Sequence, residues 1–174
     1  MKKIVALCGS TAKQSTNKLL IEAIKNLTTE KMIVHLFEGM EKLPHFNPDD
    51  DHDNPPKSIT EFRELLGSAD GILICTPEYA MGVPGTLKNA IDWTVSSMEF
   101  SHRPTALITA SSLGQKGHHS LLETLHIIEA NLTTDTQMII SHAKTKITEN
   151  GITDEETKQA VIKLLGSFVR LMNE

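Results

Sequence analysis

Residues 71–93 read GILICTPEYAMGVPGTLKNAIDW, and this stretch decides the fold. Its first five residues, 71–75, form an apolar run that begins with glycine and is soon followed by proline, which predicts a buried strand. Pro77 ends that strand and Pro84 opens a helix, because proline is tolerated in the first helical turn. The short loop between the two prolines therefore lies at the carboxyl end of a strand, where open α/β sheets bind their ligands.

The same succession of strand, loop and helix recurs along the rest of the chain. Apolar runs predict five strands, at residues 4–7, 32–37, 71–75, 105–109 and 137–140. Segments with helical spacing of apolar residues predict five helices. Three are expected at residues 16–28, 58–67 and 84–97, the second with Ser58 as N-cap. The fourth contains residues 121–128, and the last begins at residues 154–156. Residues 38–56 form a long irregular stretch, which in a compact domain is usually functional or mobile.

This alternation predicts the fold class. Five strands that alternate with helices favour an α/β three-layer sandwich, in which a five-stranded parallel sheet has helices on both faces. Right-handed crossovers leave few topologies, and the flavodoxin-like strand order 2-1-3-4-5 is the one we expect. The chain of 174 residues fits a single domain, residues 1–174. In this order the switch point lies between the first and third strands, so the loops after them should face each other.

The loop after the first strand, residues 9–17, reads GSTAKQSTN and leads into a helix. A helix N-terminus presents free N–H groups and favours an anion. The loop fits neither the GxGxxG fingerprint nor the GxxxxGK[ST] pattern of a P-loop. A helix cap by Ser15 or Thr16 is the plainer interpretation, but the position at the switch point favours a phosphate site. The side chains that could contribute are Ser10, Thr11, Lys13, Ser15, Thr16 and Asn17.

Composition limits the partners and the location of the protein. The 17 basic and 22 acidic residues give a net charge of −5, without a basic stripe, so we expect no nucleic-acid partner. No apolar run is long enough to span a membrane, and the start MKKIVALC is too short for a signal peptide, so we expect no membrane partner and a cytoplasmic protein. Cys8 and Cys75 lack the CxxC spacing of a redox pair and are expected to be buried free thiols.

Two other patterns are weak. The acidic run at 49–53 starts like a calcium loop, but Asn54 and Thr60 stand where that loop needs glycine and glutamate, so we expect no metal site. His118 and His119 are adjacent and point in different directions on a helix, which argues against a metal pair. One of them could touch a substrate, but we expect both to be surface residues at the start of a helix.

Several sequence motifs of the chain match those of one protein family. It resembles the NADPH-dependent FMN reductases, the flavodoxin-like quinone and azo-dye reductase group, which carry GSxRxxSxN after the first strand and PEYN followed by PGxLKNAIDW after the third. The first motif is matched by Gly9, Ser10, Ser15 and Asn17, and the second at residues 77–79 and 84–93. Residues 109–117 are similar to the family's Ser/Gly segment after the fourth strand. The resemblance spans essentially the whole domain.

The resemblance implies FMN as cofactor and NADPH or NADH as co-substrate. It assigns the FMN phosphate to Ser10, Ser15 and Asn17, with Thr16 nearby. The flavin and its ribityl chain would lie against Pro77, Glu78, Tyr79 and Ala80. The ring edge would meet the loop of residues 111–117, which includes Ser111 and Gly114. No catalytic residue is implied, because the cofactor carries the chemistry. The helix that starts at Pro84 would pack against a second subunit, which gives a homodimer or homotetramer.

The implied activity is that of an FMN-dependent NAD(P)H oxidoreductase. In ping-pong fashion, hydride passes from nicotinamide to flavin N5 and on to a small-molecule electron acceptor such as a quinone, an azo compound or a flavin. The long stretch 38–56, from this chain or from a partner, could cover the flavin. Tyr79 and Trp93 are the only Tyr and Trp of the chain; either could form an aromatic wall, although core or interface packing is the expected role of Trp93.

The chain departs from the family motifs at His118, where the family usually has a second glycine after Gly117, and at two further positions. Ala12 stands where the family has arginine, and Ala80 stands where it has the asparagine of PEYN. We expect FMN binding to survive both changes. They keep two alternatives open: a flavodoxin-like FMN-binding electron carrier or regulator that does not oxidise NAD(P)H, and a flavin-free structural protein on the same fold.

Overall fold

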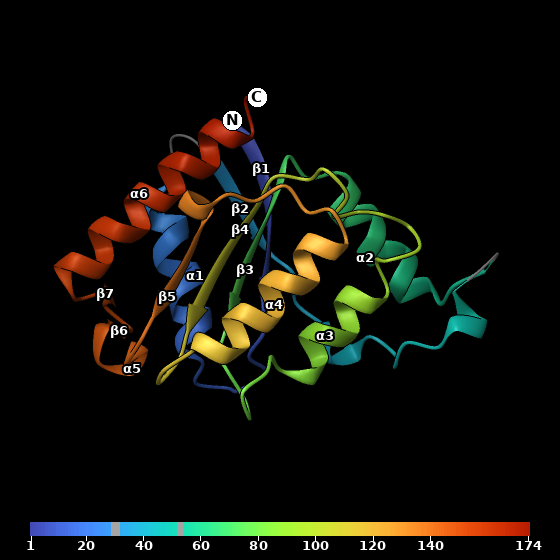
Figure 1. The fold of residues 1–174 in the computed structure, drawn as a ribbon, viewed down its shortest axis with the longest axis horizontal. Helices are drawn as coiled ribbons and strands as arrows, with labels where there is room; N and C mark the ends of the chain where they lie inside the picture. Colours follow the sequence, from blue (N-terminus) through green and yellow to red (C-terminus); the bar gives the residue numbers. More distant parts are fainter. Residues whose placement is uncertain (29–31, 52–53) are drawn as a thin grey trace.

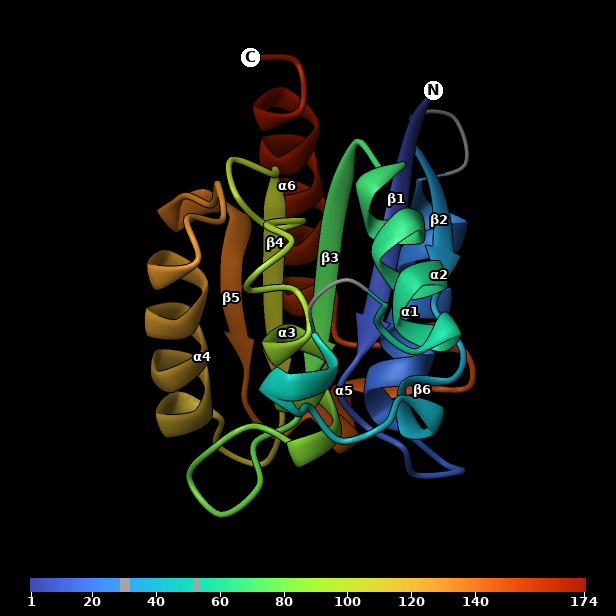
Figure 2. The same cartoon turned by 90° about the vertical axis from the view of Figure 1, so that its right-hand side faces the viewer.

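The computed structural model describes residues 1–28, 32–51 and 54–174. Its centre is a five-stranded parallel sheet of order β2-β1-β3-β4-β5, which confirms the predicted topology. Figure 2 shows these strands side by side, from β5 on one edge to β2 on the other. The strands are β1 (Lys2–Cys8), β2 (Met32–Leu36), β3 (Gly71–Thr76), β4 (Thr105–Ala110) and β5 (Gln137–Ile140), followed by a small antiparallel pair, β6 (Ile147–Thr148) and β7 (Gly151–Ile152).

Helices cover both faces of the sheet, as the alternation predicts (Figure 1). The helices are α1 (Thr16–Leu27), α2 (Lys57–Gly67), α3 (Gly85–Asp92), α4 (Gln115–Ile127), the short α5 (Ala143–Lys146) and α6 (Glu155–Leu171). One apolar core joins α1 and α6 to the sheet, and a second joins α2, α3 and α4 to the opposite face. Every residue of β3 and β4 is buried, because both faces of these central parallel strands are covered.

Helix α2 begins slightly earlier than its sequence predicts. Its first residue is Lys57, and Pro56 occupies the N-cap position without a side-chain cap. Ser58 therefore lies inside the first turn, and the expected cap by Ser58 is wrong. Proline fixes the backbone of residue 56 just before the helix, which is enough to start it without a hydroxyl cap.

Helix α3 ends earlier than its sequence predicts. It stops at Asp92, and residues 93–100 form turns rather than the expected extension to Ser97. The carbonyls that a longer helix would use are already engaged: Thr94 Oγ1 donates to the carbonyl of Ile91 (2.7 Å), and Arg63 Nε donates to the carbonyl of Trp93 (2.8 Å). The Ile91 carbonyl also accepts from the amide of Thr94 at 2.9 Å, the tighter bond of a helix end, whereas at Trp93 the side chain of Arg63 takes the place of a backbone N–H.

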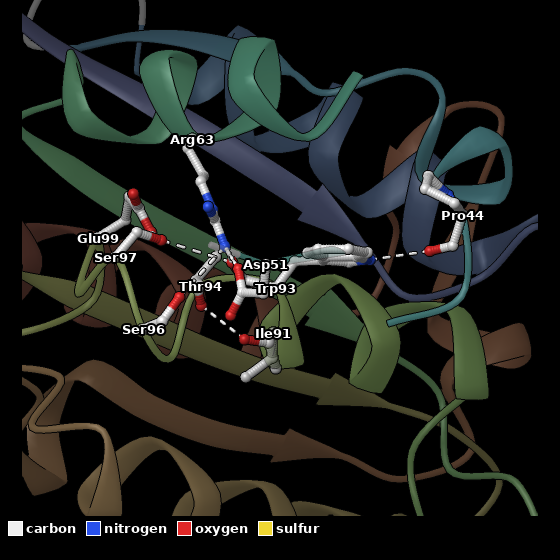
Figure 3. Close-up of polar contacts among 9 residues, drawn as sticks. All are labelled: Pro44, Asp51, Arg63, Ile91, Trp93, Thr94, Ser96, Ser97 and Glu99. Atoms are coloured by element: carbon white, nitrogen blue, oxygen red, sulfur yellow. Dashed lines mark hydrogen bonds and ion pairs between the residues drawn. The ribbon is translucent and has the colours of Figure 1, made fainter. Parts of the chain in front are cut away.

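The irregular stretch 38–56 is fastened to α2 and α3. Two short 3₁₀ turns, Met40–Lys42 and Pro48–Asp50, lie within it, and its acidic run is described only as far as Asp51. Figure 3 shows Asp51 paired with Arg63 of α2 and the Trp93 indole aimed at Pro44, to whose carbonyl Nε1 donates at 2.8 Å. Trp93 is fully buried, which confirms packing as its role and excludes it as an exposed flavin wall.

The two thiols face each other across neighbouring strands. Cys8 of β1 and Cys75 of β3 are register partners, and both are buried and free. Burial raises the pKa of each thiol, so little reactive thiolate forms at neutral pH. The prediction of two buried free thiols is confirmed. Among the described helices, none combines the length and the apolar character that crossing a bilayer requires.

Candidate functional site

A cavity of about 520 Å³ opens at the carboxyl edge of the sheet. Its wall is built from four loops, each of which follows a different strand. The loop after β1 contributes Ser10, Ala12 and residues 14–17; the other loops contribute residues 77–79, 110–112 and 142–145. Because all main strands are parallel, these loops meet at one edge, where ligands of open α/β sheets are bound.

Most of the predicted cofactor-binding residues line this one cavity. They are Ser10, Ser15, Thr16, Asn17, Pro77, Glu78, Tyr79 and Ser111. Ala80 and Gly114 lie outside the cavity wall. Gly114 is the N-cap of α4 with a φ of +96°, a conformation that L side chains rarely adopt, so it shapes the loop through its backbone.

The N-terminus of α1 points polar groups at the cavity. Ser15 is its N-cap, and Ser15 Oγ accepts from the amide of Lys18 at 3.2 Å. The amides of Thr16 and Asn17 have no acceptor within the helix by its geometry. Asn17 is 3% exposed; its Nδ2 donates to the carbonyl of Ala110 (3.0 Å), whereas Oδ1 has no partner among the described residues. The site thus offers N–H donors to an anion and one buried acceptor to a hydroxyl group.

A tight turn closes the loop after β3. The amide of Tyr79 donates to the carbonyl of Gly82, and the amide of Gly82 donates back to Tyr79, both at 2.9 Å. Ala80 and Met81 occupy the two central positions with φ of +49° and +65°, the pattern of a type I′ turn. Asparagine tolerates this left-handed region better than alanine does. Because Ala80 lies outside the cavity, replacing the family's asparagine here affects the turn rather than a pocket contact.

Glu78 joins the loops after β3 and β4. Its Oε2 accepts from the amide of Gly117 in the first turn of α4 at 2.6 Å, and its own amide donates to Ser111 Oγ at 3.2 Å. A Cβ at Gly117 would lie 2.7 Å from the carbonyl oxygen of Gly82, so glycine is needed for α4 to approach this loop. The carboxylate of Glu78 thus fixes the cavity wall and is stabilised there by a helix N-terminus.

His118 is a buried residue, and the expectation that it lies on the surface is wrong. Its Nδ1 lies 2.8 Å from Thr109 Oγ1 at the end of β4, and its Nε2 lies 3.0 Å from Gln137 Oε1 at the start of β5. Burial lowers the pKa of His118, although the hydrogen bond to Gln137 opposes the shift. His119, in contrast, is exposed as expected. His118 therefore connects α4 to strands β4 and β5.

The sequence interpretation missed the wall formed by residues 142–145. The amides of His142 and Ala143 donate to the carbonyls of Ser112 and Ser111, both at 3.0 Å. Ala143 is buried in the core, while Lys144 lines the cavity and is exposed. The signal that could have found this segment is its position directly after the fifth strand, whose carboxyl end meets the same edge of the sheet.

Comparisons with known proteins agree with this geometry. The family model of the NADPH-dependent FMN reductases matches residues 2–145. The chain is 26% identical to the NADH-dependent flavin reductase subunit 2 of Lactobacillus johnsonii over 99% of this chain and 98% of that protein. It is 31% identical to a 2-hydroxy-1,4-benzoquinone reductase of a Burkholderia species over 90% and 88% of the two chains.

A solved structure matches as well. The flavoenzyme NAD(P)H:(acceptor) oxidoreductase FerB of Paracoccus denitrificans superposes with a TM-score of 0.81 at 25% identity, and the match covers 99% of this chain and 98% of that one. The strand order and the family match over most of the chain agree. The chain belongs to the NADPH-dependent FMN reductase family, the flavodoxin-like oxidoreductases that use FMN with NAD(P)H.

Proposed function

We propose that FMN binds in the 520 Å³ cavity, with its phosphate at the N-terminus of α1 and its ring against residues 77–79 and the loop after β4. The observation that carries this placement is the buried Oδ1 of Asn17, which has no hydrogen-bond partner within the described part of the chain. It lies at a helix N-terminus, whose first amides have no acceptor within the helix. A sugar-alcohol phosphate satisfies both, because its hydroxyls donate and its phosphate accepts. The protein then catalyses reduction of a quinone, an azo compound or a flavin by NAD(P)H with ping-pong kinetics.

The residues of the cavity would bind and orient rather than react. FMN, when bound, supplies the hydride chemistry. Ser10, Ser15 and Thr16 would hold the phosphate through hydroxyl and backbone donors. Tyr79, about half exposed at the open side of the cavity, offers an aromatic surface to a flat ring. Glu78 would keep the wall in place, since its carboxylate already accepts from Gly117.

The working form would be a cytoplasmic homodimer or homotetramer. The two ends of α3 are flanked by exposed apolar side chains, Met81 before the helix and Val95 and Met98 after it. Exposed apolar side chains near the helix that the resemblance assigns to a subunit contact support this proposal. The two free thiols and the use of NAD(P)H favour a reducing compartment.

The test is an absorbance spectrum of the purified chain after incubation with FMN and desalting, followed by anaerobic NADPH and then NADH. We expect a retained yellow chromophore that one or both nucleotides bleach. A retained flavin that neither nucleotide bleaches would favour the electron-carrier alternative. A chain that keeps no flavin would refute FMN binding.

A charge variant locates the flavin in this cavity. Ser15→Asp keeps a good N-cap residue but places a negative charge at the proposed phosphate site. FMN affinity should fall at least about tenfold, as for loss of one charge-assisted contact. Ser120→Asp, on the exposed side of α4, is the matched control and should bind FMN as the wild type does. Equal FMN affinity of Ser15→Asp and wild type would exclude a phosphate at this position.

A further inference from the structure

The first loop supplies no charged side chain to the cavity. The side chains that it places in the cavity wall are Ser10, Ala12, Gln14, Ser15, Thr16 and Asn17, and none of them carries a charge. This loop therefore offers a phosphate dianion only uncharged donors, namely backbone and side-chain N–H groups and hydroxyls, together with the dipole of the helix N-terminus. A cation from elsewhere in the fold would add a stronger, charge-assisted contact.

Lys13 of the first loop and Lys18 of α1 line a second cavity, which shares Ser10 and Ala12 with the first. This second cavity has a volume of about 380 Å³ and is also lined by Glu38. Lys18 Nζ already lies 3.5 Å from Glu38 Oε1. The sequence interpretation considered Lys13 as a source of positive charge for the phosphate, but the structure places it in the wall of this second cavity.

Lys144 faces the site from the opposite wall. Within residues 1–28, 32–51 and 54–174, it is the only lysine or arginine that lines the 520 Å³ cavity. Its ammonium has no ion-pair or hydrogen-bond partner in that same part of the chain. The one acidic side chain in the wall is Glu78, whose carboxylate accepts from the amide of Gly117. Nothing described therefore competes with a ligand for the Lys144 charge.

The backbone of Lys144 is held firmly at the cavity. The preceding residue, Ala143, is 2% exposed in the core, and its amide donates to the carbonyl of Ser111 at 3.0 Å. Thr145 Oγ1 donates to the carbonyl of His142, the N-cap of the short helix α5, at 2.8 Å. When a ligand binds, only the side chain of Lys144 has to take up a fixed position. A lysine ammonium is a compact positive charge on a flexible chain, which can reach a phosphate group.

We propose that Lys144 is the cationic phosphate-binding residue of this protein, and that it supplies from the loop after β5 the charge that Ala12 does not supply from the loop after β1. This inference rests on the proposed placement of FMN in the same cavity. It makes Lys144 a specificity determinant: it favours a phosphorylated flavin over riboflavin, which has the same ring and ribityl chain but no phosphate.

The experiment titrates the full-length, flavin-free chain with FMN and with riboflavin, and follows the quenching of flavin fluorescence. In Lys144→Gln the Kd for FMN should rise about tenfold, the effect of one charge-assisted contact. The Kd for riboflavin should change less than about twofold. Lys144→Arg should keep most of the FMN affinity, and Lys13→Gln, the matched control from the first loop, should bind both flavins as the wild type does.

Salt provides a second readout. The FMN affinity of the wild type should fall as salt rises, and that of Lys144→Gln should fall less, because one screened charge pair is gone. An unchanged FMN affinity in Lys144→Gln would overturn the inference. Equal weakening of FMN and riboflavin would also overturn it, since it would show an effect on the wall rather than on the phosphate. A wild type that binds both flavins equally would refute the phosphate placement itself.

Discussion

At the scale of single residues, His118 has the most constrained surroundings near the site. Gln137 Oε1 can only accept, so His118 Nε2 must carry a proton and donate to it. In the neutral ring Nδ1 then accepts from the hydroxyl of Thr109, 2.8 Å away. If Nδ1 were protonated, the Thr109 hydroxyl could accept from it instead, so the hydrogen bonds alone do not decide the charge of the ring. Burial favours the neutral imidazole and lowers the pKa of His118.

This preference makes stability depend on pH. Because burial lowers the pKa of His118 in the folded state, the unfolded chain takes up the proton first as the pH falls below about 6.5, the usual histidine value. Stability should therefore be full above that pH and fall below it. In urea unfolding, wild type should lose more free energy of unfolding between about pH 7.5 and 5.5 than His118→Gln loses. His119→Gln, altered at the exposed neighbour, should follow the wild type; equal pH profiles for all three chains would contradict the role of His118.

At the scale of elements, the motif of α3 is explained by contacts inside the chain. Leu87, Ala90 and Ile91 pack into the core. On another side of the helix, Asn89 Oδ1 accepts from the amide of Phe46 at 2.7 Å, and Asn89 Nδ2 donates to the carbonyl of Pro44 at 2.9 Å. The side-chain amide of Asn89 thus pairs with the backbone of residues 44 and 46, as a neighbouring strand would, and holds the irregular stretch against the helix.

Removing this amide should cost stability. Asn89→Ala leaves the amide of Phe46 and the carbonyl of Pro44 without their partner, and we expect a loss of about 2 kcal/mol in the free energy of unfolding. The matched control is Lys88→Ala, whose exposed ion pair with Asp92 should contribute less than about 0.5 kcal/mol. Urea unfolding measures both. Equal stabilities of the two variants would show that Asn89 is not what holds the segment.

The sequence predicts elements better than it predicts their ends. The apolar runs predict all five main strands. The signal is clearest in β3 and β4, because a strand that is buried on both faces is a continuous run of apolar residues. The sequence does not predict where α3 ends, because the carbonyl of Trp93 accepts from Arg63, a residue 30 positions away in the sequence. Local spacing of apolar residues carries no information about such a donor.

At the scale of the whole molecule, the two faces of the sheet differ in what they expose. The face covered by α2, α3 and α4 carries the exposed Val95 and Met98, while α6 on the other face exposes Ile162. Figure 1 shows α6 and α3 on opposite sides of the sheet. If subunits associate through the surroundings of α3, only the first surface should respond to added charge.

Sedimentation equilibrium tests this arrangement. The wild type should have two or four times the mass of the chain. Met98→Asp places a charge in the proposed interface and should weaken association at least about tenfold, since an unpaired charge would be desolvated there. Aspartate is accepted at the positive φ of residue 98, so folding should be retained. Ile162→Asp is the control and should leave the assembly unchanged. A monomeric wild type, or an assembly that Met98→Asp does not weaken, would contradict the proposed interface.

The sequence by itself determined the strand order, the edge of the sheet that holds the site and most of its polar wall. The strand order follows from the alternation of strands and helices and from right-handed crossovers, and the site follows from the loops that come directly after strands. Only the tertiary structure decided that His118 is buried, that Ala80 belongs to a turn outside the cavity, and that Lys144 rather than Lys13 faces it. The turn at Ala80 is closed locally, by Tyr79 and Gly82, but the places of His118 and Lys144 depend on contacts between separate segments, such as His118 with Gln137 and Ser111 with Ala143. A single sequence does not show which distant residues meet.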